Sequence, residues 1–430
     1  MGLAFSTPSI LIALALVVIL SYLFNLLSRA TRIPSVLMLL STGLALRALS
    51  EGPLQGRIPD MQPALEVLGS IGLIMIVLEA ALDLELVREN RKMIFGGLNL
   101  TLAEIGISVA FVAAILHFGL SADWSRSVVY AIPLAILSSA IIIPSVEHLR
   151  KRSVKEFMIY QSTISDILGI MLFYFVIEGL QHPTGGWQPW LQSFLWSFVG
   201  SVVVSALFAY ALVLLLQKIR TSLKMFLLIA VLILLYAVGK ILNLSSLLII
   251  LIFGLMLRNP QIFIRGFLLR WINMDVVRSL LLDFQLITRE TAFIVRTFFF
   301  VVFGFSIALG SLTKGSTVFI SGLVVVGLLY WRGQAVKALM PNSDRIIRYM
   351  APRGLITILL FYSIPPELSI AGFDRGLLLY VILASNVYMA WGMVRHRSLS
   401  EDKTLRQVLQ ETGSVDPGAA PDSVDPVGDK

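Results

Sequence analysis

Runs of about 20 predominantly apolar residues recur from one end of the chain to the other, and this repetition limits the possible folds more than any other feature. A helix of that length crosses the hydrocarbon core of a bilayer. We count thirteen such segments, of which the second, ninth and twelfth are short or broken. They lie at about 9–28, 33–49, 65–86, 94–118, 127–148, 157–178, 191–217, 223–240, 244–257, 289–310, 316–331, 345–363 and 376–394. The sequence therefore predicts an all-α polytopic membrane protein with about 13 transmembrane helices.

Composition supports a membrane protein and excludes other classes. Apolar residues make up 57% of the chain, charged residues 14%, and the mean hydropathy is +0.86, unlike soluble globular proteins. The chain contains no cysteine, so disulfides and thiol-ligated metals are not expected. The net charge of +8 does not indicate nucleic acid, because the basic residues lie in short loops between the apolar segments. We expect no cofactor and no nucleic-acid partner.

Basic residues are concentrated in alternate loops, and this pattern predicts the orientation in the membrane. Loops rich in Lys and Arg face the cytoplasm. The basic loops lie at about 29–32, 88–92, 150–155, 218–224, 258–278, 332–348 and 395–406. We therefore expect a cell (inner) membrane protein with the amino terminus outside and the carboxyl terminus in the cytoplasm. Arg332 is counted among the cytoplasmic loop residues.

Two segments depart from the spanning pattern. Residues 261–288 are amphipathic and charged, which predicts a segment lying along the membrane interface. Residues 398–430 are polar and rich in Asp, Pro, Gly and Ser, which predicts a disordered cytoplasmic tail. The transmembrane domain is then expected at 1–397.

One ionisable residue, Asp166, lies near the middle of the sixth segment. An acidic side chain at membrane depth costs several kcal/mol and marks an ion or proton pathway by default. At 3.6 residues per turn Ser162 shares the face of Asp166, while Gln161 and Ser165 share the neighbouring face. Such an oxygen-rich strip suits a hard cation or a proton. The alternative is a polar residue satisfied at a contact between helices.

Helix-breaking residues interrupt the fifth and twelfth segments. Pro133 and Pro144 flank Ser138 and Ser139, and the stretch Pro352–Gly354 contains Arg353. Irregular backbone at membrane depth is tolerated only where protein or a water-filled cavity surrounds it. The breaks are seven segments apart, which predicts an inverted repeat of six-helix units at about 9–178 and 223–394, with a transport site between them. The alternative is a pair of unrelated proline kinks.

Four motifs resemble one known family. They are IGLIMIVLEAALDLEL with Glu79, QSTISDILGI with Asp166, ETAFIVRTFFFVVFGFSI with Arg296, and APRGL with Arg353. Together, and in this order, they resemble the monovalent cation:proton antiporter superfamily, nearest its electroneutral sodium/proton exchanger branch. The resemblance runs from the first segment to the last and leaves out the tail.

The resemblance implies a core of bundled helices around two crossed discontinuous helices, and a second layer that forms a homodimer. It implies exchange of a monovalent cation for protons by an elevator-like movement of the core, a transport activity that contributes to pH homeostasis. Sodium is the first candidate cation, with potassium and lithium as alternatives. Asp166 would alternate between cation and proton, Ser162 and Glu79 would be further ligands, and Arg296 would be a structural charge beside the site.

The chain also departs from the family pattern. Gln161 stands where the sixth-segment motif has a glutamate that pairs with the tenth-segment arginine, and Ser165 stands where it has an asparagine. Arg296 is therefore expected to pair with Glu79, Glu104 or Glu290, or to bond to Gln161.

Other polar residues carry weaker expectations. Ser138 or Ser139 could complete the cation's coordination, and Arg353 would either brace the twelfth-segment break or face a cytoplasmic funnel. Glu104 and His117 on the fourth segment are expected to be passive.

Rival functions remain at this stage. A channel or sensor on the same helices would need a repeated pore-lining element, whereas the chain has a single acidic centre. A proton-coupled transporter of another solute would share the features of an antiporter. A membrane-embedded enzyme is not expected, since none of the four His lies in a metal-ligand spacing.

Overall fold

Helices dominate the computed structural model, and no strand occurs in the ranges it describes. Those ranges are residues 7–31, 34–51, 62–86, 91–146, 149, 151–181, 187–218, 224–242, 244, 246–263 and 274–412. The longer helices are α1 (Thr7–Thr31), α2 (Ser35–Glu51), α3 (Gln62–Asp83), α4 (Arg91–Leu120), α7 (Arg152–Gln181), α8 (Trp187–Lys218), α9 (Lys224–Ile241), α10 (Ser246–Arg258), α12 (Met274–Ser306), α14 (Gly315–Leu339) and α17 (Gly376–Thr412).

The fifth and twelfth predicted segments are each split in two. The halves are α5 (Trp124–Ala135) and α6 (Ser139–Val146), then α15 (Ile346–Tyr349) and α16 (Leu355–Tyr362). Short helical pieces complete the chain at α11 (Pro260–Phe263), α13 (Leu309–Leu312) and the 3-10 turn η3 (Pro366–Leu368). All thirteen predicted segments therefore coincide with a helix or a broken helix, and both breaks fall on the predicted segments.

Length and apolar composition alone identify six membrane-spanning candidates among the described residues. Three shorter apolar helices, at Ala15–Ser28, Ile229–Ile241 and Ser246–Arg258, accompany them. The short helix α10 is almost wholly buried, because α3, α8 and α9 surround it. A helix enclosed by protein on all sides need not match the bilayer thickness, which explains why the ninth segment is short.

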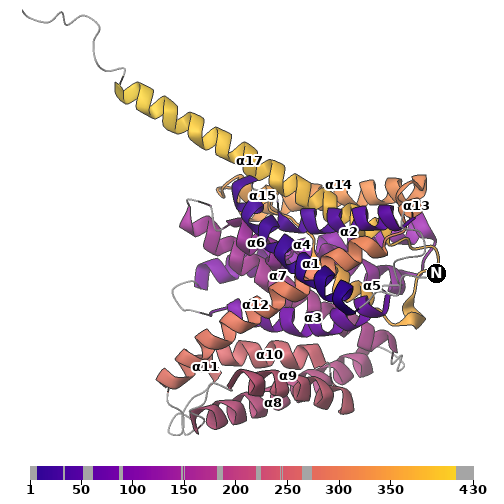
Figure 1. Cartoon of the computed structure of the whole chain (residues 1–430), viewed down its shortest axis with the longest axis vertical. Helices are drawn as coiled ribbons and strands as arrows, with labels where there is room; N and C mark the ends of the chain where they lie inside the picture. Colours follow the sequence, from indigo (N-terminus) through magenta and orange to yellow (C-terminus); the bar gives the residue numbers. More distant parts are fainter. Residues whose placement is uncertain are drawn as a thin grey trace, which may run out of the picture.

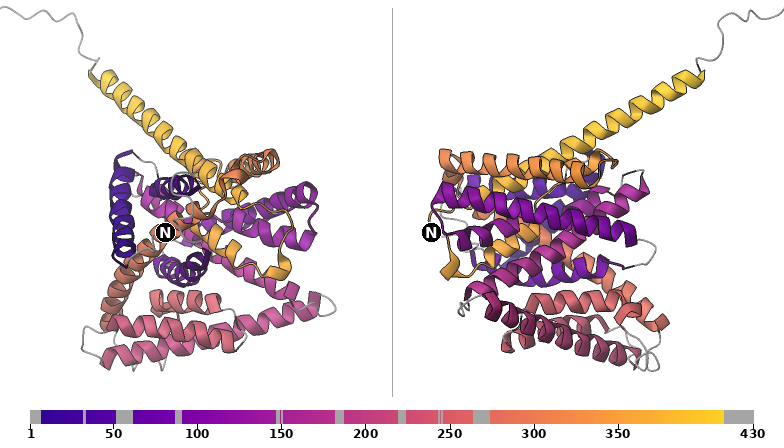
Figure 2. Two further views of the ribbon diagram at one scale, coloured as in Figure 1. Left: turned by 45° about the vertical axis from the view of Figure 1, so that its right-hand side comes forward. Right: turned by 180° about the vertical axis from the view of Figure 1, so that it is seen from behind.

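The helices pack as two groups (Figures 1 and 2). One group consists of α4, α5, α6, α7 and α14 to α17, and the other of α1, α2, α3, α8, α9, α10 and α12. In Figure 1 the helices α8 to α10 form the lowest layer, while α14 and α17 lie along the top. Helix α3 belongs to the second group and also packs against α7 and α16 in the first. The breaks and Asp166 all lie in the first group.

Helices α2 and α12 approach each other so closely that only glycine fits at their crossing. A Cβ atom at Gly43 would lie 2.2 Å from the carbonyl oxygen of Val301, and one at Gly304 would lie 2.6 Å from the carbonyl oxygen of Leu40. Small residues at such crossings let the backbones approach closely. The resulting van der Waals contact favours helix association in lipid, where a hydrophobic driving force is absent. This contact anchors α12, which carries Arg296.

Two expectations about the ends of segments are corrected. Helix α12 begins at Met274, so residues 274–288 are its first turns and not part of an interfacial segment; residues 264–273 lie outside the described residues. Helix α17 continues to Thr412, so helix replaces the expected disorder at 398–412. Extending an existing helix avoids the cost of nucleation, and Glu, Lys, Leu, Arg and Gln in this stretch favour helix. Residues 413–430 lie outside the described residues.

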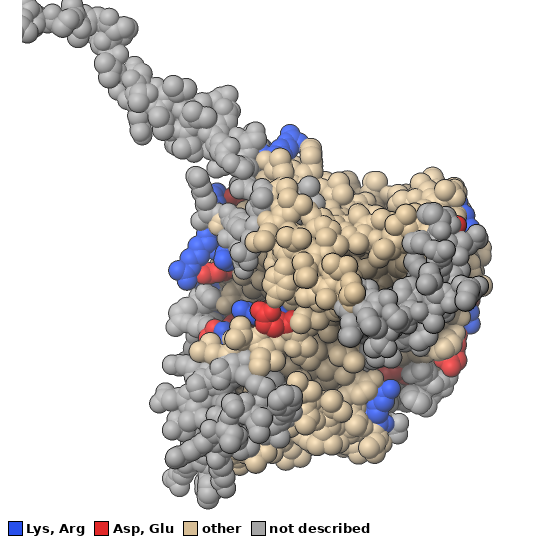
Figure 3. Space-filling model, viewed as in Figure 1, with Lys and Arg blue, Asp and Glu red and all other residues tan. Residues whose placement is uncertain are grey.

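Among the coloured atoms of Figure 3 uncharged residues predominate, and Lys, Arg, Asp and Glu form a few small groups at the edges and one near the middle of the face. Large apolar side chains are exposed along three helices that face outward. They include Leu16 and Leu23 on α1, Trp196 and Leu207 on α8, and Phe319 and Val326 on α14. Exposed apolar surface of this extent fits a lipid-facing protein.

Candidate functional site: two broken helices and a buried aspartate

The break between α5 and α6 frees three consecutive backbone N–H groups, and each finds an acceptor outside its own helix. In an uninterrupted helix they would donate to carbonyls four residues earlier. The three bonds are Leu137 N to Ser165 Oγ at 3.0 Å, Ser138 N to the carbonyl of Pro352 at 3.0 Å, and Ser139 N to Asp166 Oδ2 at 3.2 Å. The break is thus held by α7 on one side and by the second break on the other.

The second break, at residues 350–354, packs directly on the first. A Cβ atom at Gly354 would lie 2.6 Å from Ser138 Oγ and 2.6 Å from Ile141 Cδ1, so the absence of a side chain permits the contact. Helix α17 secures this break through Arg353, whose N–H donates to Ser385 Oγ at 3.0 Å and whose carbonyl accepts from Asn386 Nδ2 at 2.8 Å. The two discontinuous helices therefore meet at their interruptions, as the sequence predicts.

Asp166 lies where these elements meet and is fully buried. Its Oδ2 accepts the N–H of Ser139, while its Oδ1 has no hydrogen-bond partner in the described part of the chain. Ser138 Oγ is likewise buried and without a partner there. Buried polar atoms in proteins are usually hydrogen-bonded, so these two oxygens beside the breaks are candidate ligands for a proton or a cation.

The other predicted polar side chains on α7, those of Ser162, Ser165 and Gln161, have different hydrogen-bond partners. Ser162 is buried and donates to the carbonyl of Ile159 at 3.2 Å, and Ser165 accepts from the first break. Gln161 is also buried, but its amide bonds to Glu104 and Arg332. Ser165 and Asp166 therefore both accept backbone N–H groups of the first break, those of Leu137 and Ser139, whereas Gln161 belongs to a separate cluster.

Arg296 pairs with Glu79, one of the partners expected from the sequence. Its Nη2 lies 2.7 Å from Glu79 Oε2, and its Nη1 donates to the carbonyl of Ala140 at 3.3 Å. Pro144 has no N–H to donate to that carbonyl, so Arg296 supplies the missing hydrogen bond. The pair thus joins α3 and α12 to the first broken helix. Glu290 is exposed and accepts from the Tyr22 hydroxyl at 3.3 Å.

A cavity of about 520 Å³ leads toward this region. Its lining extends from Asp83, Ser145 and Lys155, at or near helix ends, to Ser139 and the Glu79–Arg296 pair. Asp166 does not line the cavity and is separated from it by Ser139. In the predicted orientation this is the cytoplasmic end of the molecule.

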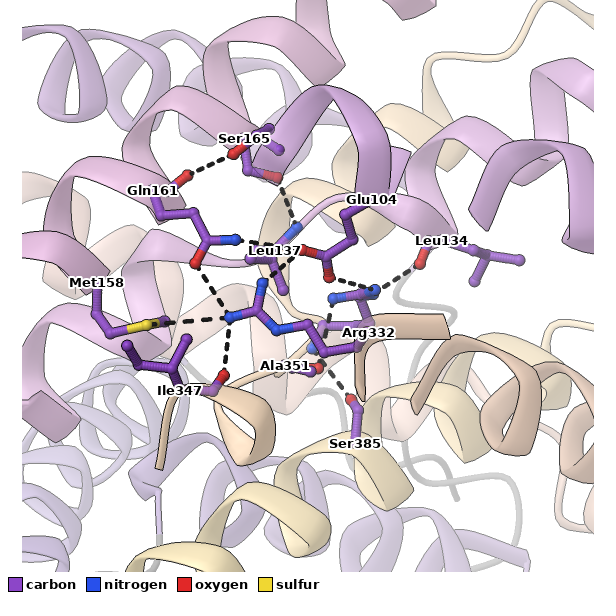
Figure 4. A network of polar contacts seen from close by, with 12 residues as sticks. Glu104, Leu134, Leu137, Met158, Gln161, Ser165, Arg332, Ile347, Ala351 and Ser385 are labelled. Carbon is purple, nitrogen blue, oxygen red and sulfur yellow. Dashed lines mark hydrogen bonds and ion pairs between the residues drawn. The ribbon is translucent and has the colours of Figure 1, made fainter. Parts of the chain in front are cut away.

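A second buried charge cluster lies in the first helix group (Figure 4). We name it the core cluster; its members are Glu104, Gln161, Arg332 and Arg353, none more than 2% exposed. Arg332 forms an ion pair with Glu104 and also donates to Gln161 Oε1 at 3.0 Å, and Gln161 Nε2 donates to Glu104 Oε2 at 3.2 Å. Arg353 Nη2 lies 3.7 Å from Glu104 Oε1.

The core cluster corrects two sequence expectations. Glu104 was expected to be passive, yet it is the carboxylate between two arginines. Arg332 was expected in a cytoplasmic loop, yet α14 continues past it to Leu339 and buries it completely. The charge is tolerated there because Glu104, Gln161 and the carbonyl of Ile347, at 2.9 Å, accept its N–H groups. The sequence feature that could have indicated this cluster is Glu104 itself, because an acid inside an apolar span needs a partner, which implies a buried cation on another helix.

Arg353 braces the break and does not face a funnel. It is 1% exposed, and its Nε donates to the carbonyl of Leu134 at 2.7 Å, the carbonyl that Ser138 would occupy in an unbroken helix. Its Nη1 lies 3.4 Å from the carbonyl of Ala351, at the second break. One guanidinium therefore contacts backbone groups of both interruptions. His117 bonds through Nδ1 to the carbonyl of Ala122 and stacks on Trp124, away from the site.

The architecture is similar to that of proteins of known structure. Two structures of the sodium proton antiporter MjNhaP1 from Methanocaldococcus jannaschii are similar at 20% sequence identity. The structure at pH 8 has a TM-score of 0.63 and covers 88% of this chain and 96% of that chain. The electron-microscopy structure has a TM-score of 0.64 and covers 93% of this chain and 98% of that chain. At this identity the likeness establishes a common fold.

A family model gives the relationship by sequence. The model described as "Sodium/hydrogen exchanger, transmembrane" matches residues 12–390, whereas no curated protein matches the chain. The matched residues include α2 to α16, both breaks, Asp166 and the core cluster. The chain therefore belongs to the sodium/hydrogen exchanger family.

Proposed function

We propose that the protein is a secondary active antiporter that exchanges a monovalent cation, sodium first among the candidates, for protons. The observation that carries this proposal is the position of Asp166. It is fully buried beside the junction of two broken helices, and one of its oxygens has no partner among the described residues. Membership in the sodium/hydrogen exchanger family supports the same activity.

Competition for one set of oxygens is sufficient for coupled exchange. A carboxylate, serine hydroxyls and backbone carbonyls are ligands that a hard cation prefers. In the proposal the carboxylate of Asp166 binds either the cation or a proton, and Ser138, Ser139, Ser162 and Ser165 supply further oxygens or order the backbone around them. An ionised carboxylate with no bound cation is costly in an apolar setting, so only the loaded forms cross the membrane.

Alternating access requires two parts that can move against each other. The packing of the helices in two groups, with α3 as the principal contact between them, supports a movement of the group that contains both breaks. The cavity ends at Ser139 and the Glu79–Arg296 pair, which supports an inward-facing state in which Asp166 is one residue away from water. Glu79 then acts as a ligand or entrance residue, and Arg296 and Glu290 set the charge around the path.

Further parts of the proposal concern the setting of the protein. We infer a homodimer, a location in the cell (inner) membrane with the amino terminus outside, and a contribution to pH homeostasis. The exposed apolar faces of α1 and α8 are consistent with contact to lipid or to a second copy. A proton-coupled transporter of another solute is the remaining alternative, since the same carboxylate would couple it to protons.

Everted vesicles with a fluorescent dye for the pH gradient test the proposal. Sodium, lithium, potassium and calcium are added in turn to vesicles containing the wild type, Asp166→Asn, or the control Glu51→Gln, a surface change at the end of α2. We expect dequenching by at least one monovalent cation in the wild type and the control, and none in Asp166→Asn. Full exchange by Asp166→Asn would remove this residue from the mechanism. No response of the wild type to any cation would favour another solute.

A further inference from the structure

The core cluster has an unusual charge composition for a membrane interior. It combines two guanidinium groups, a single carboxylate and a single amide, all at most 2% exposed. Burying an arginine is tolerated only when anions and acceptors satisfy its N–H groups. Glu104 is the only carboxylate that the described contacts give to Arg332 and Arg353. Its charge is therefore shared between the two.

The amide of Gln161 is matched to this arrangement. Its Nε2 donates to Glu104 and its Oε1 accepts from Arg332, so one side chain serves an anion and a cation together. An ionised carboxylate has no donor and could not bond to Glu104. Glu104 Oε2 accepts from both Gln161 Nε2 and Arg332 Nη1. If the two residues were exchanged, Nε2 of a glutamine at 104 could donate to a glutamate at 161 and its Oε1 could accept from Arg353, while Arg332 would turn both of its Nη groups to the glutamate at 161. The exchange thus keeps one carboxylate hydrogen-bonded to one amide, with the charge on α7 in place of α4.

The cluster is connected to the Asp166 site through backbone. Arg353, beside Glu104, holds the carbonyl of Leu134 at 2.7 Å. That carbonyl has lost its helical donor because Ser138 N–H bonds to Pro352. The next N–H, from Ser139, faces Asp166. Glu104 therefore attracts, across 3.7 Å and without a hydrogen bond, the guanidinium that fixes the break, and the break in turn presents its donor to Asp166.

We propose that the core cluster requires one negative charge, which either residue 104 or residue 161 can carry because the two side chains are hydrogen-bonded to each other; we call this the shared charge position. We also propose that Glu104 acts through Arg353 as a positioning residue for the Asp166 site. The transport part of this inference rests on the proposed function. Partners that orient the ligands of a metal ion commonly change its affinity by about 10–100-fold when mutated. The expected signature is thus a change in cation affinity and not merely in the amount of folded protein.

Three variants test the inference: Glu104→Gln, Gln161→Glu, and the double variant that exchanges the two residues. In everted vesicles Glu104→Gln is expected to raise the apparent KM for the transported cation about 10–100-fold, and in detergent it should lower the melting temperature. Gln161→Glu should also impair both, because it places a second carboxylate against Glu104. The double variant should recover most of the loss in both measurements, since it restores one carboxylate hydrogen-bonded to one amide between the two arginines.

Controls and contrary outcomes keep the test decisive. Glu156→Gln makes the same chemical change at an exposed pair on α7 and should match the wild type in both measurements. A wild-type KM in Glu104→Gln, or a loss of maximal rate that only follows the amount of protein, overturns the positioning role. A double variant that folds and transports no better than Glu104→Gln overturns the shared charge position. If wild-type vesicles exchange no cation, the proposed function fails, while the melting temperatures still test the charge position.

Discussion

Asp166 on α7 and Glu104 on α4 are buried carboxylates in the same helix group, but their surroundings are opposite. Glu104 faces two guanidinium groups and an amide donor. Asp166 receives one backbone N–H, from Ser139, and its other oxygen has no partner among the described residues. The two acids are thus equally buried, but only Glu104 has cationic side chains beside it that offset its negative charge.

This difference separates a fixed charge from an exchangeable one. A buried ion that is paired and hydrogen-bonded is compensated by its partners, and removing one partner leaves the other charge uncompensated. A buried carboxylate without a counter-charge is stable only when a proton or a cation neutralises it. In the proposed mechanism the core cluster keeps the breaks in place while the charge state of Asp166 changes.

The largest expected effect is on transport, and it comes from Asp166→Asn. Exchange should fall by more than about 100-fold, beyond the loss typical of an outer-shell partner. The free energy of unfolding should stay within about 1 kcal/mol of the wild type, because no ion pair is lost. Dye dequenching and thermal unfolding in detergent measure the two quantities. A large loss of stability would instead make Asp166 a structural charge like Glu104 and would remove the contrast between them.

The largest expected effect on stability comes from Arg332→Met. This change leaves Glu104 buried with Arg353, at 3.7 Å, as its only cationic neighbour among the described contacts, and should lower the free energy of unfolding by about 3–5 kcal/mol. The matched control is Arg126→Met, since Arg126 is exposed at the start of α5 and should matter little. Denaturant or thermal unfolding of the purified variants checks both. A loss under about 1 kcal/mol would mean that water or another group compensates Glu104.

The sequence predicts the helices and the Asp166 region because both depend on local patterns. Apolar runs of bilayer length identify the spans, and prolines with polar neighbours identify the two breaks. The placement of Asp166 beside them follows from the repeat, since discontinuous helices meet at a transporter's centre. Glu79 is one of several partners that the sequence allows for Arg296, and only the structure shows that Arg296 pairs with it.

The core cluster could not be predicted in the same way. Arg332 and Glu104 are 228 residues apart, and no local pattern records which distant helix supplies a partner. The apolar run ends at Trp331, which suggested the end of the helix. The stronger boundary signal is Pro341, because a proline disfavours helix in the residue before it. Helix α14 indeed ends at Leu339, and this places Arg332 two turns inside.

A smaller effect is expected from Gly354→Ala, which tests how closely the two breaks must pack. The new Cβ would lie 2.6 Å from Ser138 Oγ, so the breaks must separate or the serine must rotate. The expected cost is about 1–3 kcal/mol of stability, with a reduced rate of exchange. Gly322→Ala on α14 is the control, because no atom lies within 4 Å of its new Cβ. Wild-type stability and transport in Gly354→Ala would show that the crossing tolerates a wider gap.

The smallest expected effect comes from Glu79→Gln. Glu79 extends the comparison because it is ion-paired, as Glu104 is, but its side chain is partly exposed. Glu79 and Arg296 are paired at 2.7 Å, but their side chains are 18% and 13% exposed and line the cavity. Water in the cavity should screen the pair, so the variant should lose only about 1 kcal/mol at low salt.

Ionic strength distinguishes this pair from the core cluster. Raising choline chloride from about 0.01 M to about 1 M shortens the screening length about tenfold and should remove most of the Glu79→Gln effect. The loss in Arg332→Met should not respond, because no water reaches the fully buried arginine. Unfolding of both variants at the two salt concentrations makes the measurement. If the Glu79→Gln loss were as large as that of Arg332→Met and equally insensitive to salt, the cavity would be closed to ions. Asp166 would then have to be reached by another path.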